Sequence, residues 1–428
     1  MSGTHASGGS NGSSNGSGAP IGELAEILGG QHVHVGTSAD GVDGCIPSWV
    51  ARPGSVEDVQ SVLRFADKHR LAVVPVGLGG HLDAGGAARA VDLVLSLGRL
   101  ERVVDHAAGD MTVTVEAGCS LGDLDERLSD AGQWLPLDPP FSAETTVGGL
   151  VAANLSGPLR ASQGTVRDYL IGIKTVAADG QVVSGGGRVV KNVAGYDLPK
   201  LHVGAFGTLA VVVEATFKVR PRPESEAALC WTSIDAADAV DFALRVRDRH
   251  EPGWIEIAGP GALDPGLAVF AGFLGSEAEV DAAIDDLRDA FPGGEPLRGE
   301  ARDARQRIVE HARGAAVLRV ATLPTDLSSI LALGGALEGV QWHAHASAGV
   351  MRLGVTDARR IPELVRELRP RAEAVGGSLV VERATPEVKQ LLREDLAVPP
   401  SAFELMRGVK SALDPDRRLA PGRLLGGI

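Results

Sequence analysis

One stretch decides the fold, residues 139–157, which read PPFSAETTVGGLVAANLSG. It places hydroxyls, glycines and an amide around a short apolar helix, an arrangement that suits the diphosphate of a bound nucleotide. A second glycine-rich stretch, residues 73–86 (VVPVGLGGHLDAGG), begins as a buried strand. Its small residues let backbone N–H groups approach a diphosphate without obstruction by side chains. Two such stretches in one domain indicate nucleotide binding rather than ordinary turns.

The glycine loop does not follow the usual dinucleotide pattern. Leu82 stands where the last glycine of Gly-x-Gly-x-x-Gly would be, and no helix clearly opens there, so a standard Rossmann site is disfavoured. The loop belongs to a βαβ-like unit, in which Ser55 and Asp58 resemble a capping box for a helix that ends near Arg70. Strands are predicted on both sides of the loop, at 71–76 and 91–97.

The chain beyond this unit divides into two further regions. The first shows a strand at 111–116, a helix from Ser120 to Ala131, a hairpin turn at 179–180 and a long strand at 208–219, stopped by Pro221 and Pro223. The second alternates strands with longer amphipathic helices, which is typical of an α+β domain. Its predicted elements are strands at 254–258, 267–273 and 315–321 and helices at 277–291 and 326–337. After the break at Pro399 and Pro400, a further helix at 402–413 leads into a terminal segment.

Composition excludes several classes of protein. The chain of 428 residues is 44% hydrophobic and carries a formal net charge of −14, so a broad attraction to nucleic acid is not expected. Cys45, Cys119 and Cys230 lie far apart, which argues against disulfides, a zinc site and an iron–sulfur cluster and favours the reduced cytoplasm. No apolar run reaches the roughly 18 residues of a transmembrane helix. Residues 1–19 lack the features of a secretory signal.

The sequence resembles a known family, the FAD proteins of the vanillyl-alcohol-oxidase and para-cresol-methylhydroxylase (PCMH) type. The stretches that carry the resemblance are residues 139–157, GTVRD at 164–168, KNVAGYDL at 191–198 and VGAFGTL at 203–209. Within that family they are most similar to the FAD-binding E-type subunits of glycolate oxidases. The resemblance is close over residues 49–223, recognisable over 413–424 and looser between them.

This resemblance implies a fold that is part α/β and part α+β. A disordered Gly/Ser-rich tail (1–19) would precede a PCMH-type FAD-binding domain of two α/β subdomains (20–223). A smaller α+β cap domain (224–395) would follow, and a C-terminal segment (396–428) would pack back on the FAD-binding domain.

The resemblance also implies which residues bind FAD. The loop at Gly77 and the run that begins at Thr146 would hold the diphosphate and ribityl chain, and Gly164 would approach the isoalloxazine. The complete expected set is Pro75, Gly77, Gly79, Gly80, His81, Pro139, Thr145, Thr146, Gly148, Gly149, Asn154, Ser156, Gly157, Gly164, Val166, Asp168, Lys191, Asn192, Gly207, Val211 and Val212. Some relatives attach FAD covalently through a histidine of the first glycine loop. A family-type alignment puts that position at Gly80 rather than His81, so noncovalent FAD is expected.

The cap region carries a departure from its relatives. WHAHASAGVMR at 342–352 resembles the place where 2-hydroxy-acid dehydrogenases carry His-x-Gly-Asp-Gly-Asn-x-His, a metal and substrate site. His345 matches the first histidine, but Arg352 stands at the second, and the family's Glu-His-Gly appears as Glu382-Arg383-Ala384. Because arginine neither ligates a metal nor acts as a base, no metal site is expected. His343 and His345 then read more simply as strand residues, while Arg352, Arg383 and His345 remain the candidate catalytic residues, the arginines as carboxylate-binding groups.

These features favour an electron-transferring FAD oxidoreductase subunit in 2-hydroxy-acid oxidation. Its expected partners are a catalytic flavoprotein resembling the D-type subunit of glycolate oxidase and an iron–sulfur protein resembling the F-type subunit, through which it could lie peripheral to the inner membrane. Two alternatives stay open. One is a self-sufficient FAD-dependent oxidase or dehydrogenase of a small hydroxy acid or alcohol, and the other is a structural subunit without flavin.

Overall fold

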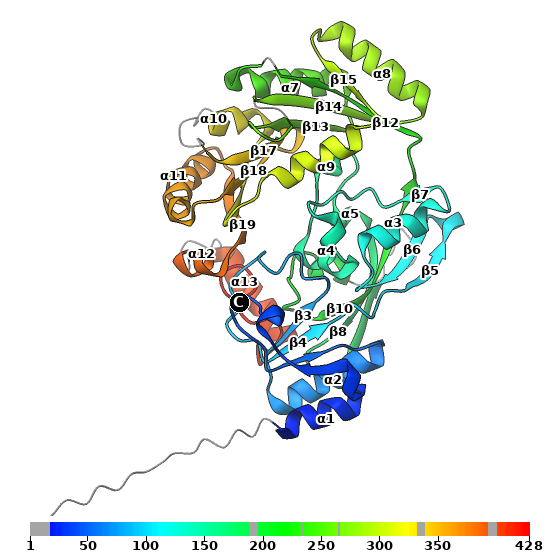
Figure 1. The fold of residues 1–428 in the computed structure, drawn as a ribbon, viewed down its shortest axis with the longest axis vertical. Coiled ribbons are helices and arrows are strands. Elements are labelled where there is room, and N and C mark those ends of the chain that lie inside the picture. Colours follow the sequence, from blue (N-terminus) through cyan, green and yellow to red (C-terminus); the bar gives the residue numbers. More distant parts are fainter. Residues whose placement is uncertain (1–17, 188–195, 233, 264–265, 332–338, 393–399) are drawn as a thin grey trace, which may run out of the picture.

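Residues 18–187, 196–232, 234–263, 266–331, 339–392 and 400–428 are described by a computed structural model. Residues 1–17 of the predicted tail and the predicted cofactor-binding residues Lys191 and Asn192 lie outside them. Figure 1 shows two α/β units in the lower half of the molecule and a larger sheet with its helices above them. This arrangement confirms the predicted fold class.

The first α/β unit is a four-stranded sheet with the strand order β1-β2-β4-β3, in which β2 and β3 both run parallel to β4. The side chain of Ser55 accepts a hydrogen bond from the backbone N–H of Asp58, and Arg70 closes the helix in the left-handed conformation, so the predicted helix is confirmed. Its elements are α1 (Gly18–Leu28), β1 (Val33–Val35), β2 (Trp49–Ala51), α2 (Val56–His69), β3 (Val73–Val76) and β4 (Leu93–Ser96).

The second unit is an antiparallel five-stranded sheet with the order β5-β6-β10-β8-β9. Ser120 caps α3 by accepting from the N–H of Asp123, as its position predicted. The elements are β5 (Val103–Ala107), β6 (Thr112–Glu116), α3 (Leu121–Ser129), α4 (Val147–Ala153), α5 (Val166–Tyr169), β8 (Leu170–Val176), β9 (Val182–Gly186), α6 (Leu198–His202) and β10 (Val211–Lys218), with β7 (Gln133–Trp134) and β11 (Arg220–Pro221) paired beside them.

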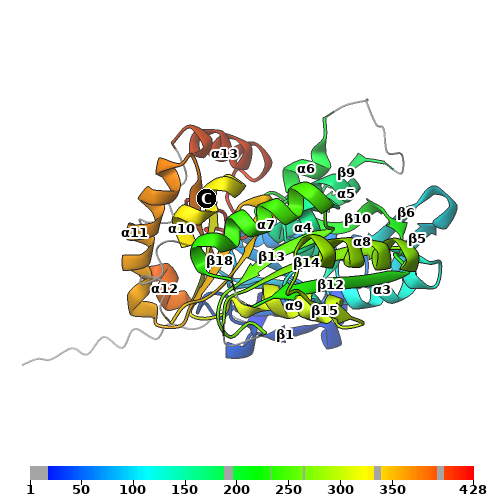
Figure 2. The ribbon, with the colours of Figure 1, turned by 90° about the horizontal axis from the view of Figure 1, so that it is seen from above.

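The upper part is an antiparallel eight-stranded sheet with the order β15-β12-β14-β13-β17-β18-β16-β19. Its strands are β12 (Ser225–Trp231), β13 (Trp254–Ala258), β14 (Ala268–Gly275), β15 (Glu295–Arg298), β16 (Ala316–Ala321), β17 (Gln341–His345), β18 (Val350–Val355) and β19 (Ser378–Ala384). Its outer face packs against α7 (Ala236–His250), α8 (Glu277–Ala290), α10 (Leu327–Leu331) and α11 (Ile361–Ala374). Its inner face meets α9 (Ala301–His311) and Leu159 of the second unit, and α9 lies between the sheet and the units below it in Figure 1. Figure 2 shows the same sheet and helices from above.

The chain returns to the first unit after β19. Helices α12 (Pro386–Leu391) and α13 (Pro400–Leu413) lead to a terminal segment that pairs with β3, where Ala420 donates to the carbonyl of Val73 at 2.8 Å. Arg423 accepts from the N–H of Gly86 through its carbonyl, also at 2.8 Å. The end of the chain therefore lies against the glycine loop.

Candidate FAD and catalytic sites

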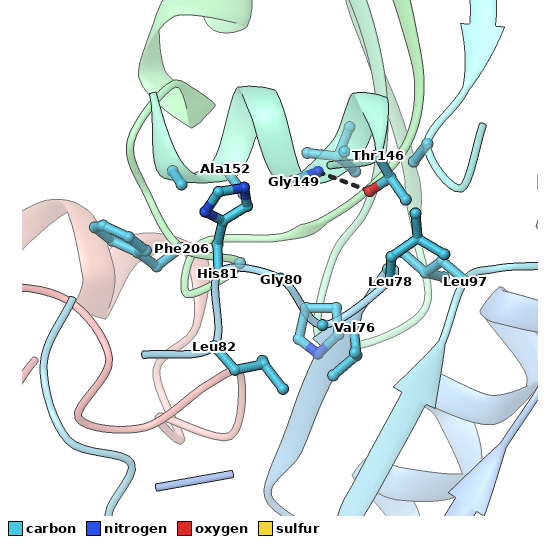
Figure 3. A pocket seen from close by; sticks show the side chains of 18 of the residues that line it. Val76, Leu78, Gly80, His81, Leu82, Leu97, Thr146, Gly149, Ala152 and Phe206 are labelled. Carbon is cyan, nitrogen blue, oxygen red and sulfur yellow. Dashed lines mark hydrogen bonds between the residues drawn. The ribbon is translucent and has the colours of Figure 1, made fainter. Parts of the chain in front are cut away.

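An open cavity lies between the glycine loop and helix α4 (Figure 3). The loop follows β3, and α4 begins at its N-cap residue Thr146. Ten of the residues predicted to bind the cofactor line it, namely Pro75, Gly77, Gly79, Gly80, His81, Thr146, Gly148, Gly149, Gly207 and Val212. The two glycine-rich stretches, which are well separated in the sequence, thus face one another across one space.

Two glycines of the loop let it lie against the segment before α4. A Cβ on Gly77 would come within 2.4 Å of the Thr146 hydroxyl oxygen, and one on Gly80 within 2.6 Å of the Glu144 carbonyl. Gly149 differs, because the nearest atom to its Cβ would be Thr146 Oγ1 at 3.3 Å. A Cβ at Gly149 would therefore press only on the Thr146 hydroxyl, and Gly149 faces the cavity.

The unpaired backbone donors of the cavity belong to the glycine loop. None of the five N–H groups from Gly77 to His81 has a hydrogen-bond acceptor within the described part of the chain. The first N–H groups of α4 are instead all used, by Cys119 at 2.9 Å, by Ala117 at 2.7 Å and by Thr146 Oγ1 at 3.1 Å. Successive free N–H groups form a concavity for an anion. Of the two stretches predicted to hold the diphosphate, the loop at Gly77 is the one that offers free N–H donors, whereas those at the start of α4 are already used.

His81 lies at the wall of this cavity as a neutral imidazole. Its Nε2 is 2.7 Å from Thr145 Oγ1, and the Thr145 hydroxyl donates to the carbonyl of Phe141 at 2.8 Å. Since that proton is committed to Phe141, Nε2 of His81 is the donor and Nδ1 carries the lone pair. Nδ1 has no partner among the described residues. Burial, helped by the charge of Arg383, lowers the pKa of His81 to about 4.

The other predicted cofactor residues within the described part of the chain do not line the cavity. Thr145 holds His81, Gly157 packs against the Asp138 carbonyl, and Asp168 accepts from the N–H of Thr165 at 2.7 Å at the start of α5. The remaining ones are Pro139, Asn154, Ser156, Gly164, Val166 and Val211. For all of these, and for Lys191 and Asn192, contact with the cofactor stays a prediction.

Sequence reasoning missed half of the cavity wall. The lining residues outside the predicted cofactor-binding set are Val76, Leu78, Leu82, Leu97, Ala117, Glu144, Ala152, Ala153, Phe206 and Arg423. Ala152 follows from the helical spacing after Gly148, and Phe206 lies inside the quoted VGAFGTL stretch. Arg423 had no local signal, because it reaches the wall through an ion pair with Asp43 at 2.9 Å, 380 residues away.

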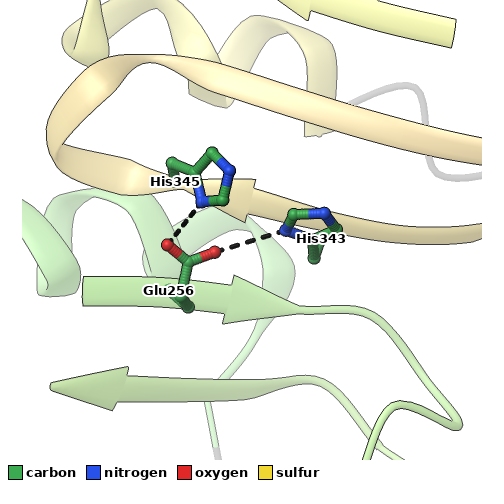
Figure 4. A group of neighbouring side chains, drawn as sticks. All are labelled: Glu256, His343 and His345. Carbon is green, nitrogen blue, oxygen red and sulfur yellow. Dashed lines mark hydrogen bonds and ion pairs between the residues drawn. The ribbon is translucent and has the colours of Figure 1, made fainter. Parts of the chain in front are cut away.

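A second polar centre lies on the inner face of the eight-stranded sheet. Arg352 pairs with His343 across β17 and with Arg319 across β16, so these three side chains form a row on one face. His345, two residues after His343, shares that face and pairs with Glu256 of β13. Figure 4 shows the carboxylate of Glu256 between the two imidazoles.

Hydrogen bonds connect this centre from one end to the other. Arg352 donates to Glu382 at 2.6 and 3.1 Å and to Nε2 of His345 at 2.6 Å. His345 is neutral, because burial and the charges of His343 and Arg352 lower its pKa well below the ordinary value. Because Nε2 accepts from Arg352, its proton is on Nδ1, which donates to Glu256 at 2.6 Å.

The carboxylates at the two ends differ in their pKa. Burial, and then the charge of Asp138, raises the pKa of Glu256 well above its ordinary value. Burial acts in the same direction on Glu382, but the charge and hydrogen bonds of Arg352 outweigh it and hold the pKa of Glu382 at about 2. The ionised carboxylate therefore lies beside the guanidinium.

Arg383 is separated from this centre and contacts the glycine loop. It donates to Asp83 at 2.9 Å and to the carbonyl of Gly80 at 3.0 Å, and its guanidinium lies 4.6 Å from the ring centre of Phe141. Of the three predicted catalytic residues, the structure therefore brings together Arg352 and His345, while Arg383 joins the upper sheet to the cavity wall.

Comparisons with known proteins give the family context of this geometry. Residues 47–186 match the family described as FAD binding domain. A D-2-hydroxyglutarate dehydrogenase of Xanthomonas citri pathovar viticola is 30% identical over 427 residues, which cover 88% of this chain and 89% of the relative. The glycolate oxidase protein GlcE of Escherichia coli is 41% identical, but only over 128 residues, 30% of this chain and 37% of that protein.

A solved structure extends the comparison to the whole fold. Para-cresol methylhydroxylase with bound substrate has a TM-score of 0.77 at 17% identity and covers 97% of this chain and 98% of its own. The expected PCMH-type architecture and FAD as cofactor are confirmed. The specific likeness to the E-type subunits of glycolate oxidases is not, since a dehydrogenase matches over nearly the full length. No helix in the described residues is long and apolar enough to cross a membrane.

Proposed function

Because the chain belongs to the family of FAD-dependent oxidoreductases with a PCMH-type FAD-binding domain, we propose that it is an electron-transferring flavoprotein subunit in the oxidation of a small 2-hydroxy acid. Bound FAD supplies the electron-accepting chemistry, and the protein sets its position. The chain's partners would be a catalytic flavoprotein resembling the D-type subunit of glycolate oxidase and an iron–sulfur protein resembling the F-type subunit.

The residues of the cavity fit FAD without a covalent link. The five free N–H groups from Gly77 to His81 suit a diphosphate, and Gly149 leaves room beside them. The Nδ1 lone pair of His81 would accept a hydrogen bond from a hydroxyl of the cofactor. Lys191 and Asn192 would contribute at the flavin edge.

One observation carries the subunit proposal, namely that His345 is engaged at both nitrogens. Its Nε2 accepts from Arg352 and its Nδ1 donates to Glu256, both at 2.6 Å. Oxidation of a 2-hydroxy acid needs a group that takes the hydroxyl proton. The guanidinium groups of Arg352 and Arg383 offer only donors, so neither can take it. The other imidazole of this centre, His343, has an Nε2 without a partner among the described residues but is fully buried, so a partner that supplies an accessible proton acceptor would complete the reaction.

Reconstitution tests this proposal. The purified chain is mixed under anaerobic conditions with glycolate, with and without a flavoprotein that carries both histidines of the dehydrogenase motif. The chain's flavin should stay oxidised alone and become reduced with the partner. Rapid reduction of the chain alone would contradict the proposal, and a colourless chain would favour the structural alternative.

A second candidate is a self-sufficient dehydrogenase of a 2-hydroxy acid. It is favoured by the full-length likeness to a named dehydrogenase and by the arginines near Arg352. Arg160 has no side-chain hydrogen bond to a described residue, and burial and the charges of Arg352 and Arg319 lower its pKa. Arg319 lies 3.8 Å from Glu382, beyond hydrogen-bond distance. The Arg160 guanidinium would be free to hold a substrate carboxylate, whereas Arg319 is already in an ion pair with Glu382.

A further inference from the structure

The positive charge at the polar centre of the upper sheet is the guanidinium of Arg352. Arg352 is only 5% exposed, and its guanidinium lies between the lone pair of His345 Nε2 and the carboxylate of Glu382. An imidazole nitrogen and a carboxylate oxygen directed at one buried positive charge are the donor groups with which proteins bind Zn²⁺ and similar ions. Here those donors converge on a guanidinium.

The far side of His345 strengthens the likeness to a metal centre. Its Nδ1–H donates to Glu256 at 2.6 Å, and Glu256 is fully buried. Imidazoles that bind metals usually donate their other N–H to a carboxylate or carbonyl, which orients the ring and makes the ligating nitrogen more basic. Glu256 thus orients His345 toward Arg352 as it would orient a metal ligand (Figure 4).

We propose that Arg352 is a built-in replacement for a divalent metal, so that this centre keeps its positive charge without binding a metal ion. The charge is permanent, because guanidinium does not lose its proton in proteins. The inference goes beyond the proposed function, since it holds whether the chain only passes electrons or also oxidises a substrate.

One other grouping near this centre has the composition of a metal site. Glu256, His343 and His345 bring one possible ligand atom each within 4.8 Å of one another. A metal there would displace the 2.6 Å hydrogen bond between His345 and Glu256 and would lie across the imidazole ring from the fixed charge of Arg352. Repulsion between the two cations disfavours that position.

Replacing Arg352 by histidine tests the proposal. The wild-type chain and Arg352→His are incubated with Zn²⁺, desalted and analysed for metal. The wild type should retain no stoichiometric zinc, whereas the variant should hold about one ion per chain and unfold at a higher temperature with zinc than without it. Arg319→His is the matched control, because Arg319 shares the row but lies 3.8 Å from Glu382 and has no bond to His345. It should gain no zinc.

Second substitutions locate the ion. In the Arg352→His background, Glu382→Gln should abolish zinc binding and His343→Ala should preserve it. Stoichiometric metal in the wild type, or no zinc in Arg352→His, would overturn the proposal. If Arg352→His does not fold, Arg352→Lys keeps the charge and should fold without metal, and zinc bound by that variant would overturn the proposal as well.

Discussion

Gly149→Leu should remove FAD from a chain that still folds. A Cβ at Gly149 meets no protein atom nearer than 3.3 Å, so the added side chain extends into the cavity rather than into the core. Leucine also favours a helix over glycine by roughly 0.5–1 kcal/mol, which offsets any small local cost within α4. The fold should therefore survive the substitution.

The loss of affinity can be worked out from the free donors of the glycine loop. A leucine beside the loop would keep the diphosphate away from some of the five unpaired N–H groups between Gly77 and His81. Hydrogen bonds to a charged group contribute about 1.5–3 kcal/mol each. Losing two of them would weaken FAD binding by about 3–6 kcal/mol, on the order of a hundredfold to ten-thousandfold.

The assay is titration of the apoprotein with FAD, together with circular dichroism. Gly22→Leu is the matched control, because Gly22 is an exposed helical glycine of α1 with no atom within 4 Å of its Cβ. Gly148 is less suitable, because its Cβ would lie 2.9 Å from the Ala117 carbonyl and would disturb the packing of α4. Unchanged FAD affinity in Gly149→Leu would refute the assignment of this cavity to the diphosphate.

The flavin linkage, the ion pair of Arg352 and the burial of His202 can each be tested in solution. Acid precipitation of the holoprotein should leave the flavin in the supernatant, and flavin in the pellet would implicate His81 in a covalent bond. Arg352→Met should lower the free energy of unfolding by about 3–5 kcal/mol, because it leaves Glu382 without its buried partner. Arg359→Met, which removes an exposed ion pair, should change the free energy of unfolding little. Equal unfolding curves for the two variants would contradict this. Burial lowers the pKa of His202 to about 4. Below a pH of about 6.5 the unfolded chain therefore binds a proton at this histidine that the folded chain does not bind. The contribution of His202 to the free energy of unfolding thus falls by roughly 3 kcal/mol as the pH drops from 6.5 to 4. Thermal unfolding of His202→Phe should show a smaller pH dependence over that range, and an unchanged dependence would exclude His202 as its source.

The sequence predicted helices and strands well where interactions between residues close in sequence determine them. The Ser55 cap and the amphipathic spacing behind it defined α2, and the strand at Trp254–Ala258 has the predicted bounds. The helix predicted at 326–337 is present as α10 over Leu327–Leu331, and residues 332–338 lie outside the described part. Strands such as β12 and β18 were missed, because neighbouring strands and helices, rather than their own sequence pattern, determine their pairing.

In the two candidate sites, too, local motifs were predictable and contacts between residues distant in sequence were not. The glycine run around Gly77 was recognisable, because small residues at a strand end have few other uses. The contact of Arg352 with His345 was not predictable, and neither was the role of Glu256, because Glu256 lies 89 residues from His345 and carries no motif of its own. Which donors of the cavity are free also depended on tertiary structure, since Cys119 and Ala117 occupy the first N–H groups of α4.

Stopped-flow absorbance of the isolated, flavin-loaded chain with glycolate or lactate under anaerobic conditions tests the central claim most directly. The account predicts slow flavin bleaching or none, because His345 is engaged at both nitrogens and the arginines cannot accept a proton. Reduction by dithionite would show that the flavin is competent. Fast, stoichiometric bleaching at low substrate concentration would contradict the subunit proposal and establish a self-sufficient dehydrogenase.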